Sequence, residues 1–364
     1  MVDLRRDSAP RGTAFSARDA VADTPGADNT IADRAVERDA VELDALFGGS
    51  LFCDLVFAGA DIPGPGEEVY ASGFALTVGG TANRAVATAR LGMRTGIVAV
   101  LGDDPLSAYV RSFLAAEDGV NLDWVETRSD TVVPVSVALT NAHDRSFITY
   151  EEAQTHMPVT LAGSLPRVGS CQIALSDADV VWAKELRATG TTIYGGVGWD
   201  SSGRWEPSTL DLLDHVDVFI PNEIEATSYT RTDSALDAAK VLAERVPFVV
   251  ITRGRHGVLA IDGVSGETAT ASAVPVDAAD PTGAGDVFTA AFMASADEPW
   301  PLKTRLQFAS LAASLSVRSL GGAVSAPYPA TIAEFITHQE PEGDWADILH
   351  WSREKEAPQK TTQA

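Results

Sequence analysis

The order of apolar and polar segments predicts an α/β protein with a mostly parallel central sheet, helices on both of its faces and a small β lid. Short apolar runs alternate with helical patterns through most of the chain, which is typical of parallel strands joined by crossover helices. Glycine-rich turns lead into apolar helical patterns at 78–83 and 280–286. Strands at about 55–78 and 132–150 break the alternation, and we expect them to form the lid.

The predicted elements follow one another from residue 45, where an apolar run over 45–56 is interrupted by Gly48 and Gly49. Two later runs, 132–140 and 146–150, flank a polar turn and predict a hairpin. The other strands are predicted at 95–101, 172–175, 191–197, 216–221, 247–252, 257–262 and 268–273. Helices are predicted at 81–91, 106–116, 178–188, 236–243, 286–296 and 302–319.

The two ends of the chain differ in composition from its middle. Residues 1–42 are rich in Asp, Ala, Arg and Thr and poor in large apolar residues, which predicts a disordered acidic tail. Residues 43–336 are predicted to form one α/β domain. Residues 337–364 are predicted to be a polar C-terminal extension, in which the apolar residues of 345–351 indicate a helix that docks elsewhere on the protein.

Charge and composition exclude several classes of protein. The chain has 364 residues, a hydrophobic content of 45% and a formal net charge of -24. Because the electrostatic field of so acidic a protein repels phosphates, we expect neither nucleic acid nor an anionic membrane as a partner.

Residues that often bind metals or form disulfides are few and scattered. The two cysteines lie in apolar runs and predict buried free thiols, and the six histidines are too scattered for a zinc site. The N-terminus lacks the apolar segment of a signal peptide, and no apolar run approaches the length of a membrane span. We therefore expect a cytoplasmic protein.

The segment 280–286 says most about function. Gly283, Ala284 and Gly285 leave their backbone N–H groups uncovered by bulky side chains, at the positive end of the helix that follows. These amides predict an anion hole, and Asp286 at its edge is a candidate general base. Phosphoryl transfer needs both parts, a cradle for developing negative charge and a carboxylate that accepts a hydroxyl proton. The alternative is an ordinary helix cap.

A second glycine turn and a single acid are candidates for binding a substrate. Gly79 and Gly80 allow the backbone to approach a ligand closely, and Asn83 in the next helical turn offers an amide to a hydroxyl. Asp54 is expected at the end of an apolar strand, in the crevice where α/β sheets bind ligands, where its carboxylate could accept hydrogen bonds from two sugar hydroxyls. The alternatives are a glycine turn packed by alanines and a solvated strand end.

Two further turns are candidates for the phosphate and nucleotide side. Asn222 and Glu225 lie three residues apart at a helix start and share a face, which suits water-bridged Mg²⁺. A capping arrangement explains the same two residues equally well. The strand that ends at Thr252 opens into a turn with Gly254 and Gly257, whose backbone could contact phosphates or ribose. A plain hairpin turn is the alternative.

Together, four motifs resemble those of the PfkB carbohydrate kinases, the ribokinase-like family. GGTAN at 79–83 and DPTGAGDVFTAAF at 280–292 are similar to that family's two signatures. PNEIEA at 221–226 resembles its NxxE motif, and VITRGRHG at 250–257 its nucleotide loop. Their order and spacing agree over roughly residues 43–336. The resemblance implies a ribokinase-like three-layer fold with a β lid, and ATP- and Mg²⁺-dependent phosphorylation of a hydroxyl on a sugar or a similar small molecule.

The resemblance also implies a role for each candidate residue. Asp286 would be the base, with Gly283, Ala284 and Gly285 as the anion hole. The substrate would be held by Asp54, Gly79, Gly80 and Asn83. Asn222 and Glu225 would organise phosphate and, indirectly, Mg²⁺, and the nucleotide site would be lined by Thr252, Gly254 and Gly257. Many members also bind a monovalent cation such as K⁺, and the positions that match are Asp280, Thr282, Gly321 and Ser325.

The sequence does not decide whether the substrate of such an enzyme is a sugar or a nucleoside. The glycine turn is one residue shorter than the GGKGAN of ribokinases and lacks its lysine, which argues against ribose. A nucleoside kinase of the same fold is the first alternative, and an aromatic wall near the lid, with Phe74, Phe147 and Tyr150 as candidates, would favour it. A non-catalytic sugar-binding regulator is the second, and the intact motif at Asp286 argues against it.

The lid also suggests how two copies of the chain could associate. An exposed strand at the edge of a sheet invites pairing with another strand. We therefore expect a homodimer through the lids.

Overall fold

The computed structural model of the protein describes residues 41–140, 145–151 and 166–356, so the tail predicted at 1–42 lies almost wholly outside the described residues. One group of strands comprises β1 (Leu43–Gly48), β4 (Thr95–Leu101), β5 (Val120–Thr127), β8 (Val168–Ala174), β9 (Thr192–Gly196), β10 (Val218–Phe219), β11 (Phe248–Thr252), β12 (Val258–Asp262) and β13 (Thr268–Ala271). A second group comprises β2 (Leu51–Ala58), β3 (Gly73–Gly80), β6 (Val135–Thr140) and β7 (Arg145–Tyr150).

The helices come between and after these strands. The α-helices are α1 (Thr81–Arg90), α2 (Pro105–Ala115), α3 (Asp177–Ala188), α4 (Glu223–Thr230), α5 (Ala235–Ala243), α6 (Ala284–Ala294), α7 (Leu302–Ser316), α8 (Pro329–Gln339) and α9 (Ala346–Glu356). Short 3-10 turns are η3 (Pro207–His215), η4 (Gly254–His256) and η5 (Gly322–Ser325).

The first group of strands forms a sheet in the order β13-β12-β11-β10-β9-β8-β1-β4-β5. Its strands pair in parallel from β5 to β11, and β12 and β13 join antiparallel at one edge. The second group forms a smaller sheet in the order β3-β2-β6-β7. The expected mostly parallel sheet and the separate small sheet are both confirmed.

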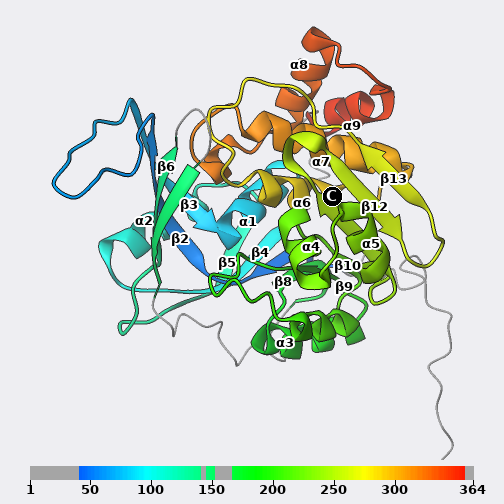
Figure 1. The fold of residues 1–364 in the computed structure, drawn as a ribbon, viewed down its shortest axis with the longest axis horizontal. Helices are drawn as coiled ribbons and strands as arrows, with labels where there is room; N and C mark the ends of the chain where they lie inside the picture. Colours follow the sequence, from blue (N-terminus) through cyan, green and yellow to red (C-terminus); the bar gives the residue numbers. More distant parts are fainter. Residues whose placement is uncertain (1–40, 141–144, 152–165, 357–364) are drawn as a thin grey trace, which may run out of the picture.

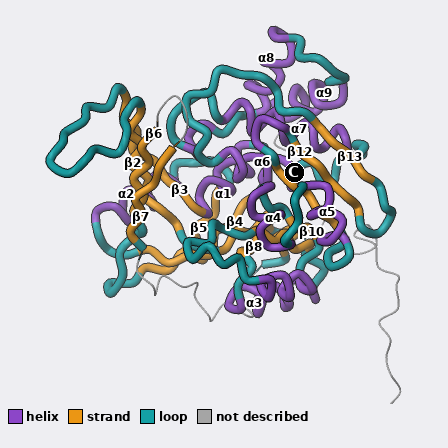
Figure 2. The backbone as a smooth tube through the Cα atoms, in the orientation of Figure 1, coloured by secondary structure: helices purple, strands orange, loops and turns teal. Residues whose placement is uncertain are grey.

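Helices cover both faces of the large sheet. One buried apolar cluster includes residues of α1, α6, α7, α8 and α9, and a second includes residues of α3, α4 and α5. Figure 1 shows the small sheet, with β2, β3 and β6 at its left, standing beside this three-layer body. We refer to the small sheet as the lid. Long loops at 59–72, between two lid strands, and at 272–283, before α6, extend from the regular elements in Figure 2.

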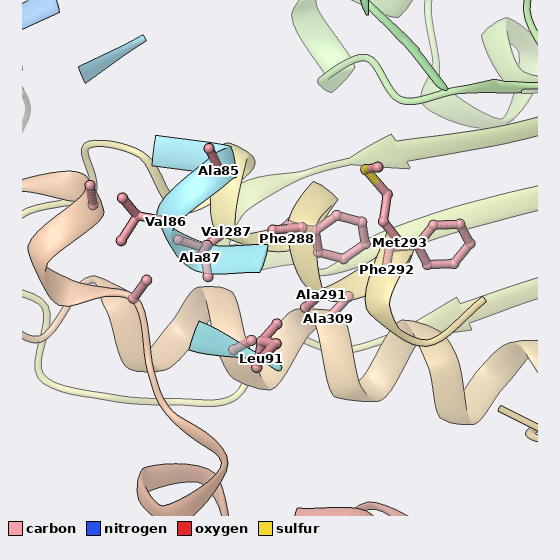
Figure 3. Close-up of a cluster of buried hydrophobic side chains, with 14 of the residues drawn as sticks. Ala85, Val86, Ala87, Leu91, Val287, Phe288, Ala291, Phe292, Met293 and Ala309 are labelled. Carbon is pink, nitrogen blue, oxygen red and sulfur yellow. The ribbon is translucent and has the colours of Figure 1, made fainter. Parts of the chain in front are cut away.

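Helix α6 packs between α1 and α7, as the close-up in Figure 3 shows. The contacts involve small side chains, among them Ala85 and Ala87 of α1, Ala291 of α6 and Ala309 of α7. Small residues let helix axes come close together. The packing therefore brings the first turns of α1 and α6, which follow the two glycine motifs, against each other.

Several predicted boundaries were wrong. The run 45–56 is two strands in different sheets, because the chain turns at Gly49, whose φ of +139° few other residues adopt. Strand β5 and helix α8 were not predicted, and the boundary expected at residue 336 falls inside α8.

The expected C-terminal helix is present as α9. It packs on the same core, with Trp345 and Trp351 buried and Trp351 against Phe308. Within the described ranges, none of the helices has the length and apolar character needed to cross a bilayer.

Candidate active site

The turn before α6 is held by a buried carboxylate. Asp280 is fully buried, and its Oδ1 and Oδ2 accept the backbone N–H groups of Thr282, at 2.9 Å, and of Gly321, at 3.0 Å. Gly283 is the N-cap of α6 with φ 75°, a conformation that glycine adopts without strain. A Cβ on Gly283 would lie 2.9 Å from the Cα of Gly322, so the turn also needs glycine for space.

The start of α6 is open. Among the described residues, no side chain caps it, and no atom would lie within 4 Å of a Cβ on Gly285. The N–H groups of Gly285 and Asp286 have no hydrogen-bond partner among the described residues, whereas the N–H of Ala284 donates to the carbonyl of Pro281 at 3.3 Å. The predicted anion hole therefore has free donors, but the amide of Ala284 is partly engaged.

The Asp286 carboxylate accepts hydrogen bonds from two side chains of α1. Asn83 Nδ2 donates to Oδ2 at 3.1 Å, and Arg84 Nη1 donates to Oδ1 at 2.5 Å. The side chains of Arg84 and Asp286 keep 22% and 23% of their surface exposed, so solvent or a ligand can reach the pair. Sequence reasoning placed Asn83 near the site and missed Arg84, whose signal was a lone basic residue directly after Asn83.

Asp54 lies in the middle of lid strand β2, not at the end of a strand of the large sheet as expected. It pairs with Thr77 on β3 and Ser136 on β6, and its side chain is buried against Gly79. A Cβ on Gly79 would overlap the carboxylate, so any larger residue there would displace Asp54 from this position. Burial, and then the charges of Asp286 and Asp280, raise the pKa of Asp54 to about 7. The lid therefore presents a buried acid close to the charge of Asp286.

Gly80 sits where the lid joins α1. It is the N-cap of α1 with φ 62°, and a Cβ there would lie 2.5 Å from the carbonyl of Ser50. The N–H of Thr81 donates to that carbonyl at 3.0 Å. This tight turn directs the first turn of α1, with Asn83 and Arg84, towards α6.

The candidate residues at the start of α4 close a capping box. Asn222 Oδ1 accepts the N–H of Glu225, and Glu225 Oε2 accepts the N–H of Asn222, both at 2.9 Å. The capping alternative that sequence analysis left open is therefore present in the structure. Burial raises the pKa of Glu225 to about 7, with hydrogen bonds from Asn222 acting against it and the charge of Asp286 adding to it.

The nucleotide candidates adjoin this cap. Thr252 forms a bridge with Asn222, and its N–H donates to the carbonyl of Pro221 at 3.1 Å. Gly254 has φ 52° and open space around it, while a Cβ on Gly257 would overlap the carbonyl of Ala271. The loop that follows Ala271 borders a groove of about 1700 Å³, whose other walls come from α7, α8 and the segment 340–345.

Three of the four candidate cation positions are linked through Asp280, which accepts the N–H groups of Thr282 and Gly321, and Ser325 contacts the segment just before Gly321. Asp280 and Gly321 are hydrogen bonded, and the Oγ1 of Thr282 is buried with no partner among the described residues. Ser325 Oγ donates to the carbonyls of Ser319 and Leu320, each at 3.2 Å. In the part of the chain that the structure describes, no group of three or more His, Cys, Asp or Glu side chains is arranged to hold a metal ion.

The three candidate aromatic residues do not share one face of the lid. Residues that pair across two strands lie on the same face of the sheet, and so do residues two positions apart along one strand. Phe147 pairs with Ala138, two residues from Ser136, and so shares the face of Asp54. Phe74 and Tyr150 lie on the opposite face and are more than half exposed. Only Phe147 could therefore contribute a wall to this site within one chain.

Comparison with known proteins gives one family. The sequence model of the pfkB family of carbohydrate kinases matches residues 45–329. The ribokinase of Haemophilus influenzae is 26% identical over 305 residues, which are 80% of this chain and 97% of that protein. The ribokinase of Bacillus subtilis is 29% identical over 297 residues, 79% of this chain and 98% of that protein.

Solved structures share the fold. The Arabidopsis thaliana ribokinase complexed with ribose and ATP superposes with a TM-score of 0.68 at 24% identity, covering 81% of this chain and 98% of that one. A nucleoside kinase of Burkholderia thailandensis in complex with inosine gives a TM-score of 0.67 at 23% identity, covering 82% of this chain and 100% of that one.

Proposed function

The chain belongs to the pfkB family of carbohydrate kinases, a family of phosphotransferases, and on that premise we propose that it transfers the γ-phosphoryl group of ATP to a hydroxyl of a sugar or sugar derivative. The observation that carries the proposal is the start of α6. The N–H groups of Gly285 and Asp286 have no partner among the described residues, and the Asp286 carboxylate beside them is oriented by donors from another helix. No other helix start among the described residues combines these two features.

In the proposed reaction Asp286 accepts the proton of the acceptor hydroxyl as its oxygen attacks the γ-phosphorus of ATP. The bond from the γ-phosphorus to the bridging oxygen breaks, and ADP leaves. The N–H groups of Gly283 and Gly285, with a weaker contribution from Ala284, would stabilise the charge that develops on the transferred group. A carboxylate at a helix start is stabilised in its charged form by the helix dipole, which suits a base.

The acceptor is proposed to bind between the lid and α1. Asp54 would accept hydrogen bonds from its hydroxyls, and Asn83 would contribute an amide. Gly79 makes room for the Asp54 carboxylate, which fills the position that a Cβ would take there, and Gly80 allows the tight turn into α1. Closure of the lid would exclude water and so limit hydrolysis of ATP.

ATP is proposed to bind along Asn222, Thr252, Gly254 and Gly257, with the groove beyond Ala271 continuing from that side. Mg²⁺ would neutralise phosphate charge. Glu225 fits a water-mediated contact, because the capping box uses Oε2 and leaves Oε1 without a partner among the described residues. K⁺ would fit beside Asp280 and the Oγ1 of Thr282, which has no partner among the described residues. Gly321 is hydrogen bonded to Asp280, and Ser325 follows Gly321 by four residues.

A nucleoside acceptor is the second candidate, and one observation favours it. Phe147 shares the inner face of the lid with Asp54 and could pack against a base. The Burkholderia nucleoside kinase with inosine shows that this fold serves such substrates.

We also propose a homodimer through the lids. The face opposite Asp54 carries a set of apolar residues: Leu55, Phe57, Phe74, Leu76, Val137, Leu139, Ile148 and Tyr150. Several of these side chains are exposed, and an apolar surface of this kind is typical of an interface. Light scattering should give twice the mass of the chain, and Phe74→Glu should shift it to the monomer. A monomeric wild type would rule the proposal out.

The kinase proposal is tested by ATP consumption against a panel of sugars, sugar derivatives and nucleosides with Mg²⁺, using Asp286→Asn as the matched variant. Turnover on a sugar that the variant loses supports the proposal, and turnover on nucleosides alone supports the second candidate. Sugar binding without any turnover would support a regulator instead. Near-normal turnover by Asp286→Asn would refute its assignment as the base.

A further inference from the structure

The candidate site concentrates negative charge. Asp54 from the lid, Asp280 and Asp286 from the turn and start of α6, and Glu225 from α4 act on one another electrostatically. Asp286 raises the pKa of both Asp54 and Glu225, and Asp280 raises that of Asp54. A site that must also accept the phosphates of ATP needs a positive charge among these groups.

Arg84 supplies that charge at the base itself. It is the fourth residue of α1, one position after Asn83, and the two side chains donate to different oxygens of the Asp286 carboxylate. Because both donors come from one helical turn, they set the plane of the carboxylate and leave each oxygen with a lone pair. The Nε of Arg84 is buried and has no partner among the described residues, so the guanidinium makes its one described ion pair with Asp286.

We propose that Arg84 is a positioning residue for the phosphoryl transfer: with Asn83 it orients the Asp286 carboxylate towards the acceptor hydroxyl and balances its charge. The proposal rests on the proposed function, because it assigns Arg84 a role through the base. A base that is oriented by a third group is a recurring arrangement in enzymes that activate a hydroxyl. Arginine suits this place better than lysine because its planar fork fixes direction as well as charge.

The groups that face Asp286 define what losing Arg84 would do. Asn83 would remain as a neutral donor, and the acids Asp54, Asp280 and Glu225 would remain in the site. With only the hydrogen bond from Asn83 left, the Asp286 carboxylate would be free to rotate about its Cβ–Cγ bond. Without the positive charge of Arg84, it would also take up a proton more readily. Both changes lower the rate of the chemical step and leave ATP binding at Asn222 and Thr252 in place.

The experiment compares Arg84→Met and Arg84→Lys with Arg94→Met, which removes a partly exposed ion pair to Asp44 beyond the C-terminal end of α1, whereas Arg84 lies in its first turn. The kcat and the KM for ATP and acceptor are measured across pH. For Arg84→Met we expect kcat to fall roughly 10- to 100-fold with a KM for ATP within about twofold of wild type. The acid limb of its pH–rate profile should move to higher pH. Arg84→Lys should return the acid limb of the pH–rate profile to its wild-type position but recover only part of kcat. Arg94→Met should match wild type in both.

A second measurement separates this proposal from the kinase proposal. A double-mutant cycle of thermal unfolding with Arg84→Met and Asp286→Asn reports the interaction of the two side chains without any turnover. A coupling that is present at neutral pH and absent in acid supports the pair even if no acceptor is found, and no coupling overturns it. A coupling accompanied by an unchanged kcat and acid limb in Arg84→Met would make the pair structural and overturn the positioning role.

Discussion

Helices α4 and α6 place an acid at the same position and use it in opposite ways. Glu225 and Asp286 are each the third residue of their helix. In α4 the N-cap is Asn222, and Glu225 folds back to close a capping box with it. In α6 the N-cap is Gly283, which has no side chain, and Asp286 turns away to Asn83 and Arg84 on α1.

The difference between the two helix starts shows what allows a helix start to bind an anion. A capping box satisfies its own free amides, so the start of α4 is complete without a ligand. A glycine N-cap leaves the amides of α6 free and releases the acid for another contact. The same local pattern therefore stabilises the fold in one helix and prepares an anion site in the other.

The largest expected difference between the two helix starts is in turnover. Asp286→Asn should lower kcat by about 10²- to 10⁴-fold, because it removes the proposed proton acceptor, and should lower the melting temperature only by what the ion pair with Arg84 contributes. Glu225→Gln should lower kcat less and should reduce stability by about 1 kcal/mol, because it weakens a capping box. Steady-state kinetics and thermal unfolding of both variants check this. A larger loss of turnover in Glu225→Gln would reverse the roles of the two helix starts.

The glycines of the open start give a second contrast. Gly283→Ala should reduce both stability and turnover, since its φ is positive and a Cβ would press on Gly322. Gly285→Ala should fold normally, because its Cβ meets empty space, yet it should lose turnover, by roughly 10- to 100-fold, if that space receives the transferred phosphoryl group. Unfolding and kcat of the two variants are the measurements. Full activity in Gly285→Ala would mean that the open space is not part of the reaction.

The buried acids predict a pH dependence of stability. The pKa of Asp54 rises from 3.8 to about 7 on folding, so the folded state binds more protons and loses stability as pH rises between these values. A shift of three units corresponds to an upper bound of about 4 kcal/mol. Asp54→Asn should therefore raise the melting temperature at pH above about 7 and change it little in acid. Glu225→Gln should shift the melting temperature in the same direction at high pH, because the pKa of Glu225 is also raised, but it weakens the capping box at every pH. A melting temperature of Asp54→Asn that falls equally at every pH would contradict the burial argument.

The smallest expected effect concerns the turn before α6. If K⁺ binds beside Asp280 and Thr282, potassium at ten times its Kd should add about 1.4 kcal/mol to stability. Thr282→Val should reduce this gain, and Thr227→Val in α4, whose hydroxyl donates to the carbonyl of Glu223, serves as the control. Thermal unfolding in potassium and in choline salts measures both. Equal melting temperatures in the two salts for wild type would remove the cation site.

Much of the fold and part of the candidate site could be predicted from the sequence because their causes are local. Alternating apolar and helical segments specify a parallel sheet, and glycine turns before helices specify open helix starts. The cap at Asn222 and Glu225 could be anticipated from their spacing, although its competition with a metal role could not be resolved. Strand β5 and the division of 45–56 into two strands were missed, because a single glycine decides whether the chain continues or turns into another sheet.

The sequence by itself determined which residue types could do chemistry: backbone amides at 283–285 without bulky side chains over them, a carboxylate at Asp286 and a second acid at Asp54. Only the tertiary structure decided their neighbours. Arg84 and Asp286 are 202 residues apart and meet because α1 and α6 pack through small side chains. Asp54 acquires its raised pKa because lid strand β2 buries it beside other acids. Contacts and burial arise from the packing of distant segments, which no local pattern encodes.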